Sequence, residues 1–437
     1  MKGSSVGLSF DVKASNRIGF PGGWGSGRYR LEAMVLCALS IPGSLKAQQV
    51  LAPPTSYVAV PAAVQEMQSE GAGSLRALDT LAPLLPHGLP FEMGPVTVHP
   101  HLSYRFLYGN GLSAAPGDQV ASIIQEVSPG VLLEIGRHWT IDYTPIQRFY
   151  SDRRFQNGLD QNVSLIGGTS YEDWVLGLSQ TYASTFTPLV QTAQQTDQQA
   201  FATGLTASYR FNSKLSLEMG LDQAITSAEG FNSSKQWSTM EWLAYQIWPR
   251  LDVSVGAGGG YVTESMGSDS AYGQLQGRVQ WRATEKVSLQ VHAGFEDRQF
   301  LASSANLLNP LYGVSIAYQP IAETSLSLSA DRTVSSSLLQ DQVTENTALT
   351  VSLSQQLLKK LSLNLAASYG EINYISELNA GSAGRVDSMY SFNAHLGWPF
   401  LKRGTAGVFY QFSNNNSSQN GFSYSSNQVG LELGYRY

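Results

Sequence analysis

The sequence predicts an all-β protein: a transmembrane antiparallel up-and-down β-barrel of about 18 strands, with about 16–18 strands fitting the pattern. Three observations predict this fold. Apolar and polar residues alternate with period two in many segments, short turns alternate with longer polar loops, and residues 48–437 contain no long apolar run. Because side chains of a strand point alternately to its two faces, such segments can face lipid on one side and water on the other.

The composition also favours a barrel over a helical membrane protein. The chain of 437 residues has 14% charged and 11% aromatic residues, and its mean hydropathy is −0.13. Only half of the residues in a membrane strand face lipid, so a barrel keeps the average hydropathy of a soluble protein. The net charge of −6 provides no basic surface for nucleic acid, and we expect no such partner.

Residues 1–47 are interpreted as a signal peptide with an N-terminal extension. Arg28 and Arg30 precede the apolar stretch 34–41, and a small residue stands before a cleavage position ahead of Gln48. A short hydrophobic helix of the mature protein is the alternative. The single cysteine, Cys37, lies inside this segment, so the mature chain would contain no disulfide.

Residues 48–94 are rich in Pro and Ala and show little alternation, which predicts a periplasmic arm or linker. A plug that enters the barrel is the alternative for this segment. Residues 95–437 are predicted to form the outer-membrane β-barrel.

The alternating segments come in hairpins. Leu215, Leu217, Met219 and Leu221 alternate with polar or small residues, and a similar segment starts at Val287. Breaks such as 248–250 and 358–360 are short, whereas 227–235 and 335–342 are longer and polar. This asymmetry is typical of outer-membrane barrels, whose short turns face the periplasm.

An even number of strands places both ends of the barrel on the periplasmic side. Pro129 and Pro145 fall in the second and third predicted strands, where they cannot donate to the hydrogen-bond ladder. The predicted strands are 96–108, 122–136, 138–150, 159–168, 173–184, 199–211, 215–226, 236–247, 250–262, 271–282, 286–299, 310–319, 324–334, 344–356, 361–374, 387–398, 403–413 and 425–437.

A soluble β-sandwich or propeller is the alternative fold. Aromatic residues near the ends of the predicted strands, such as Trp139, Trp174 and Trp398, are interpreted instead as girdles at the two membrane interfaces. A sandwich has far fewer strands, and propeller blades repeat a recognisable motif that this chain lacks.

The chain ends on LELGYRY, residues 431–437, and contains the segments 128–133 (SPGVLL), 139–145 (WTIDYTP), 171–174 (YEDW) and 176–180 (LGLSQ). With these features it resembles the outer-membrane beta-barrel porin family of Gram-negative bacteria, in particular a poorly characterised porin-like group. The resemblance implies a location in the cell outer membrane, surrounded by its lipid. It also implies an insertion signal, read by the barrel-assembly machinery, at Leu431, Leu433, Tyr435 and Tyr437.

The inward positions indicate what passes through the barrel. If the apolar positions face lipid, the candidate lumen-lining residues are Arg105, Arg210, Glu218, Asp222, Arg278, Arg282, His292, Glu296, Arg298, Asp331, Glu432 and Arg436. Arg278 and Arg282, beside Glu296 and Arg298, are predicted to form a constriction cluster. The alternative is that these charged residues only pair with one another and keep the inner wall solvated. No long loop that would fold inward is evident in the sequence.

These features predict a porin-like passive channel for small hydrophilic solutes. The alternative is a structural or accessory barrel, linked to surface polymer export or surface contacts, without open-channel activity. The histidines form no nucleophile motif, and His99 and His101 lack further obvious metal ligands. We therefore expect no enzymatic activity and no catalytic, cofactor-binding or metal site.

Overall fold

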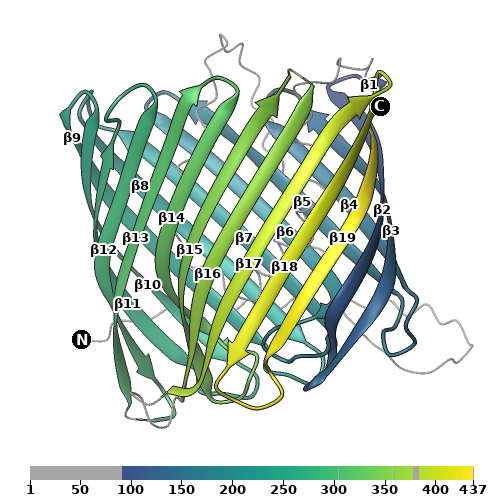
Figure 1. Ribbon diagram of the computed structural model, residues 1–437. Helices are drawn as coiled ribbons and strands as arrows, with labels where there is room; N and C mark the ends of the chain where they lie inside the picture. The colour runs from purple at the N-terminus through teal and green to yellow at the C-terminus, as the bar shows by residue number, and fades with distance from the viewer. Residues whose placement is uncertain (1–90, 304, 359, 377–382, 437) are drawn as a thin grey trace, which may run out of the picture. The chain divides into compact units, whose positions relative to one another are not determined.

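The computed structural model describes residues 91–303, 305–358, 360–376 and 383–436. These residues form a closed antiparallel barrel of 18 strands, β2–β19, with one short strand, β1, beside β2 (Figure 1). The predicted signal peptide, nearly all of the predicted arm and Tyr437 lie outside the described residues. No helix in the described part is long and apolar enough to cross a membrane.

The strands follow one another around the ring in chain order, and β19 pairs with β2 to close it. Their bounds are β1 Phe91–Met93, β2 Val96–Ala115, β3 Asp118–Ile135, β4 Trp139–Tyr150, β5 Gly158–Tyr171, β6 Trp174–Pro188, β7 Gln195–Arg210, β8 Leu215–Ala228, β9 Ser234–Trp248, β10 Leu251–Glu264, β11 Ser270–Trp281, β12 Val287–Phe300, β13 Asn306–Ile321, β14 Thr324–Ser336, β15 Gln342–Leu357, β16 Leu361–Ser376, β17 Ala383–Phe400, β18 Gly404–Ser417 and β19 Tyr424–Arg436. The predicted fold class and strand number are confirmed.

Alternation along each strand builds the two faces of the wall. In β9, Trp237, Leu243 and Tyr245 are exposed on the outside, whereas Ser238 and Trp242 between them are buried on the inside. Most of the other strands expose large apolar side chains in the same way, such as Leu102 of β2, Leu275 of β11 and Tyr410 of β18. Exposed apolar side chains around the outer face of a barrel form the surface that lipid covers.

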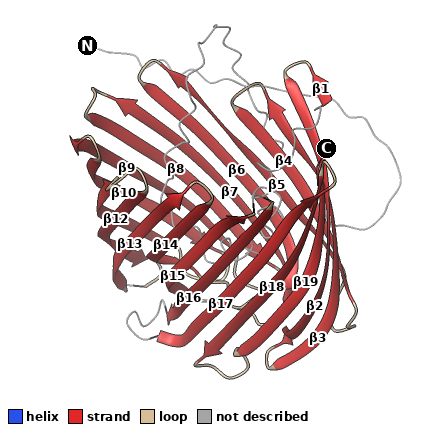
Figure 2. Ribbon diagram, turned by 45° about the horizontal axis from the view of Figure 1, so that its top comes forward, coloured by secondary structure: helices blue, strands red, loops and turns tan. Residues whose placement is uncertain are grey.

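Several strands are longer than predicted, and Figure 2 shows the described regular structure to be strand throughout. β2 continues to Ala115 and β7 starts at Gln195, although the sequence there is polar and was expected to form loops. Beyond the lipid both faces of a hairpin meet water, so a polar composition does not end a strand. The expected alternation of short turns and longer loops holds, except at the tight turn between β2 and β3 and at the β11–β12 turn, 282–286, which is as long as the loop 265–269.

Pro129 and Pro145 lie within β3 and β4, at the places where the strand prediction was weakest. The β3–β4 register runs from Val127↔Gln147 to Val131↔Tyr143 with an interruption between them, and this interruption contains both prolines. Two residues that lack an N–H therefore share one gap in the ladder, and β3 stays paired with β2 and β4 with β5 across it.

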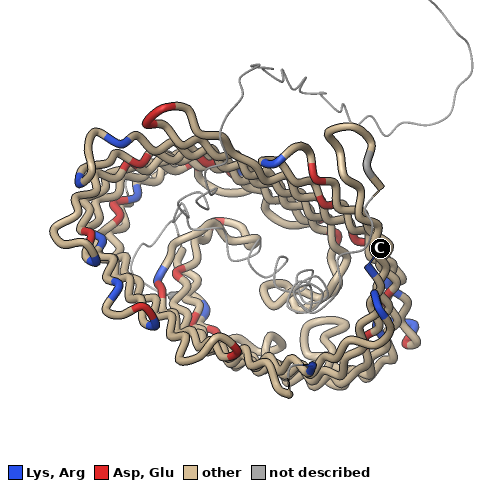
Figure 3. Tube along the Cα trace, turned by 90° about the horizontal axis from the view of Figure 1, so that it is seen from above, with Lys and Arg blue, Asp and Glu red and all other residues tan. Residues whose placement is uncertain are grey.

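One hairpin leaves the wall and folds into the barrel. The β13–β14 register starts at the short-turn end and stops at Tyr312↔Arg332, whereas β14 stays paired with β15 up to Ser336. Val343 and Ile375, beyond this point, pack against Phe300 and Leu307 of β12 and β13. We call residues 333–346 the infolded hairpin. In the view along the barrel, part of the described chain lies inside the ring of the wall (Figure 3).

Candidate functional site

The predicted lumen-lining residues occupy inward positions of their strands, but at different depths. Glu218 and Asp222 lie on β8, Arg278 on β11, and His292, Glu296 and Arg298 on β12. Asp331 lies on β14. The other predicted arginines, Arg210, Arg282 and Arg436, stand at strand ends beside the short turns. Arg282 is therefore at the rim, apart from the residues with which it was grouped.

Four charged residues on adjacent strands form a cross-strand row on the inner wall. Glu432 of β19 is opposite Arg105 of β2, Arg105 is opposite Glu126 of β3, and Glu126 is opposite Arg148 of β4. We call this the charged row. Because directly opposite residues point to the same side of a sheet, the register brings alternate signs together.

The charged row is a continuous network of buried ion pairs. Arg105 Nη1 lies 2.8 Å from Glu126 Oε2, and its Nε lies 3.5 Å from Glu432 Oε2. Arg148 Nε lies 2.8 Å from Glu126 Oε1, and its Nη1 lies 3.0 Å from Asp160 Oδ2 on β5. Each guanidinium contacts two carboxylates, so the positive charges of the row are neutralised within the wall.

An apolar cluster adjoins the charged row. Leu107, Ile124 and Phe409 point inward beside it and pack with Phe155 from the β4–β5 loop, and the Arg105 guanidinium lies 4.3 Å from the Phe409 ring centroid. Asp152 and Arg154 of the same loop form an exposed pair, and the hydrogen bonds from Arg154 lower the pKa of Asp152 to about 2. The loop thus places its apolar residue inward and its charges in water.

A second group of ion pairs lies on β8 to β12. Arg278 Nη2 is 2.6 Å from Glu218 Oε2, and Arg298 Nε is 2.9 Å from Glu296 Oε1. The two guanidinium groups lie over the rings of Trp242 and Tyr272. Arg278 therefore pairs with β8 rather than with Glu296 of the predicted constriction cluster.

Trp242 lies flat against the inner wall because the facing residue on β10 is Gly256. A Cβ at Gly256 would stand 2.6 Å from two carbons of the indole. This close approach holds the ring beneath Arg278, where cation–π contact adds to the ion pair.

The narrowing of the lumen comes from two hairpin tips that meet across the ring. The tip between β6 and β7, residues 189–194, and the tip of the infolded hairpin, residues 337–341, start from nearly opposite sides of the barrel. Leu189 and Leu338 share one apolar cluster, and Leu338 N donates to Gln191 Oε1 at 3.1 Å. We call these two tips the constriction.

Arg385 of β17 fastens the β6–β7 tip. Its guanidinium donates to the backbone oxygens of Gln191 and Val190 at 3.0 and 3.3 Å and is paired with Asp387. The ring of Phe422 lies 3.8 Å from the Arg385 guanidinium carbon. Arg385 was not among the predicted lumen residues, because its strand neighbours give no sign that a distant tip reaches it.

Backbone strain is also located at the constriction. Ala193 and Asp341, one in each tip, have φ values of 52° and 54°, a region that residues with a Cβ seldom adopt. Ala193 is buried, and its carbonyl accepts a hydrogen bond of 2.8 Å from Ser113 Oγ. Tertiary contacts therefore hold both tips in costly conformations. Neither tip is predicted from the sequence to enter the lumen, because both are short.

An uncharged row occupies the strands that precede the charged row in the ring. Ser329, Thr350, Ser368 and Ser391 are opposite one another on β14 to β17, and the row continues at its ends through the hydroxyls of Ser315, Ser413 and Ser426. We call this the hydroxyl row. Ser368 and Ser391 hydroxyls lie 2.6 Å apart. The lumen thus has a charged arc and a neutral, hydrogen-bonding arc.

Comparison with known proteins agrees with this architecture. Residues 261–437 match the family described as "Putative beta-barrel porin 2". The predicted resemblance to beta-barrel porins is confirmed. The same match supports the predicted outer-membrane location of this porin-like barrel. No curated protein matches the chain.

Solved structures similar to the porin-like barrel include three proteins of two bacteria. Pseudomonas aeruginosa OpdO is 14% identical, with 78% of this chain and 97% of that chain covered and a TM-score of 0.42. Acinetobacter baumannii OccAB3 is 11% identical, with 78% and 99% covered and a TM-score of 0.42. Pseudomonas aeruginosa OccK2, in complex with glucuronate, is 12% identical, with 78% and 98% covered and a TM-score of 0.42.

Proposed function

We propose that the protein is a porin-like passive channel for small hydrophilic solutes. The observation that carries the proposal is the polarity of the inner wall, where ion pairs and hydroxyls line a ring whose outer face is apolar. A ring of 18 strands is wide enough to enclose a water-filled path, and the constriction would set its narrowest part. The proposed activity is passage, without catalysis.

The charge balance of the wall supports a weak preference for cations. Arg105, Arg148, Arg278 and Arg298 each contact a carboxylate. Asp331 points inward on β14 and forms no ion pair within the described part of the chain. The positive groups are thus neutralised in place, and a small negative excess remains along the path.

The test is an electrical recording of the purified full chain in a planar bilayer that separates two KCl concentrations. We expect stepwise conductance increments, with a reversal potential displaced modestly toward that of K⁺. A reversal potential displaced toward that of Cl⁻ would refute the proposed charge balance. Absence of steps at high protein load would refute the channel.

A structural or accessory barrel is the second candidate, and the contact between the two tips favours it. Leu189 and Leu338 share an apolar cluster, although their tips start from nearly opposite sides of the barrel. A barrel without open-channel activity would remain sealed both in the unmodified chain and in a variant whose tips are separated. Linkage to surface polymer export or surface contacts would then require a partner.

Export and assembly are proposed from the two ends of the chain. We infer that residues 1–47 direct export, that residues 48–94 form a periplasmic arm, and that the barrel-assembly machinery of a Gram-negative cell reads the last strand. Leu431, Leu433 and Tyr435 are exposed on the outer face of β19, as such a signal requires. Deleting Tyr437 should lower the amount of heat-modifiable barrel in the outer-membrane fraction. Unchanged amounts would contradict this role.

A further inference from the structure

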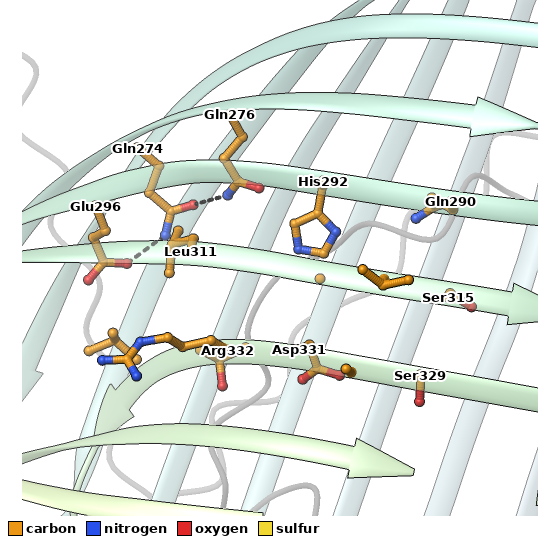
Figure 4. A pocket seen from close by; sticks show the side chains of 15 residues that line it. Gln274, Gln276, Gln290, His292, Glu296, Leu311, Ser315, Ser329, Asp331 and Arg332 are labelled. Carbon is orange, nitrogen blue, oxygen red and sulfur yellow. Dashed lines mark hydrogen bonds between the residues drawn. The ribbon is translucent and has the colours of Figure 1, made fainter. Parts of the chain in front are cut away.

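A cavity of about 290 Å³ lies where the infolded hairpin leaves the wall. Its lining comes from the inner faces of β11, β12 and β13 and from β14, which bends away from β13 beyond Arg332. Figure 4 shows the side chains of three glutamines, His292 and Asp331 around one space. The cavity thus exists because β13 and β14 are unpaired over part of their length.

Amide and hydroxyl groups dominate the polar lining. Gln274, Gln276, Gln290, Ser315 and Ser329 contribute them, and the last two belong to the hydroxyl row. Amides and hydroxyls both donate and accept hydrogen bonds, which is the property that a solute with many hydroxyl groups requires. Apolar side chains of the lining, such as Leu311 and Val334, complete the cavity.

A chain of hydrogen bonds orients the amides and leaves one acceptor unused. Gln276 Nε2 donates to Gln274 Oε1 at 3.1 Å, and Gln274 Nε2 donates to Glu296 Oε2 at 2.7 Å. Gln276 is only 6% exposed, and its Oε1 has no hydrogen-bond partner among the described residues. A buried acceptor of this kind is costly unless a ligand donates to it.

A carboxylate faces the same space from the other side. Asp331 is directly opposite Gly313, which is directly opposite His292. A Cβ on Gly313 would lie 2.2 Å from His292 Cε1, so the glycine lets the imidazole lie over the strand between the two side chains. The lining therefore presents Asp331 to a ligand, together with His292 and the amides.

We propose that this cavity binds an uncharged polyhydroxy solute of monosaccharide size. Hydroxyls of the solute would donate to Gln276 Oε1 and to the Asp331 carboxylate and would accept from the glutamine amides. A volume near the lower end of small-molecule sites, about 300 Å³, suits one sugar ring rather than an oligosaccharide. Glu296 is paired with Arg298, and Arg332 of the lining is paired with Glu345, so the Asp331 carboxylate is the charge that disfavours an anionic sugar. The inference deepens the proposed channel function, and it rests on that function for its role in passage.

The test measures binding to the full chain folded in detergent micelles, by equilibrium dialysis with radiolabelled glucose. We expect saturable binding that Gln276→Leu weakens about tenfold, because a lost hydrogen bond to a buried group has roughly that effect on affinity. Asp331→Asn should also weaken binding. Gln411→Leu, an inward glutamine on the distant strand β18, is the matched control and should bind glucose like the unmodified chain.

Three outcomes would overturn the site: no saturable glucose binding, an equal loss in Gln411→Leu, or tighter binding of glucuronate than of glucose. Heat-modifiable gel mobility of each variant shows that its barrel is folded. If Gln276→Leu does not fold, the near-isosteric Asp331→Asn decides. Binding does not depend on conductance, so a protein that conducts without binding glucose refutes the site alone. A protein that binds glucose without conducting refutes the channel alone.

Discussion

The charged row on β19 to β4 and the hydroxyl row, centred on β14 to β17, line neighbouring arcs of the same lumen, yet they use hydrogen-bonding capacity in opposite ways. Arg105 and Glu126 each pair with two opposite charges across adjacent strands, and such buried pairs have fixed partners and little freedom. Ser368 and Ser391 also contact each other, but hydroxyls rotate and can exchange one partner for another. The charged row is therefore suited to holding the wall together, and the hydroxyl row to contacting solutes.

The largest expected effect comes from breaking the charged row at its centre. Glu126→Ala leaves Arg105 and Arg148 buried without their shared carboxylate, which should cost about 3–5 kcal/mol of unfolding free energy. The measurement is the urea midpoint of the heat-modifiable band in detergent or lipid. A midpoint equal to that of the unmodified chain would show that the row does not stabilise the barrel.

The second-largest effect is expected from a mutation in the constriction, and it is a change in conductance. Leu338→Ser removes an apolar side chain from the cluster that joins the tips, and a docking loss of about 2 kcal/mol raises the undocked fraction on the order of 30-fold. We expect longer or more frequent large-conductance steps in a planar bilayer.

Leu358→Ser is the matched control for this variant. Leu358 is highly exposed at a turn on the opposite end of the barrel. The conductance of the Leu358→Ser variant should therefore equal that of the unmodified chain. Identical traces for Leu338→Ser and the unmodified chain would mean that the tips do not limit the path.

The smallest effect is expected in the hydroxyl row. Ser368→Ala removes the 2.6 Å contact with Ser391 and should lower the unfolding free energy by only about 0.5–1.5 kcal/mol. The same urea titration measures it. A loss of unfolding free energy as large as that of Glu126→Ala would show that the hydroxyl row stabilises the barrel as much as the charged row does.

Period-two alternation was sufficient to predict the fold and both members of three ion pairs, Arg105–Glu432, Arg278–Glu218 and Arg298–Glu296. It assigned Arg105, Glu432 and Arg278 to the inner face, because a one-residue shift would move all apolar neighbours away from lipid. It missed Glu126 and Arg148, which lie in the two strands that contain prolines, where inward apolar residues also blur the alternation.

Contacts between distant strands could not be predicted from period-two alternation, which assigns a residue to a face but not to a partner. The partner of Arg278 depends on register accumulated over several strands. The infolded hairpin has the polar composition of a loop, so the sequence predicted a surface loop at 335–342 and nothing that reached Leu189. The lining of the cavity depends on the same departure from the wall, and only Glu296, His292 and Asp331 of that lining were predicted to face inward.

A polar path through this barrel should conduct ions, and a bilayer recording of the unmodified chain measures this conductance. We expect stepwise conductance with a modest preference for K⁺ over Cl⁻, and larger steps when Leu338→Ser frees the tips. A bilayer that stays sealed with both proteins, although each is folded and inserted, would contradict this expectation.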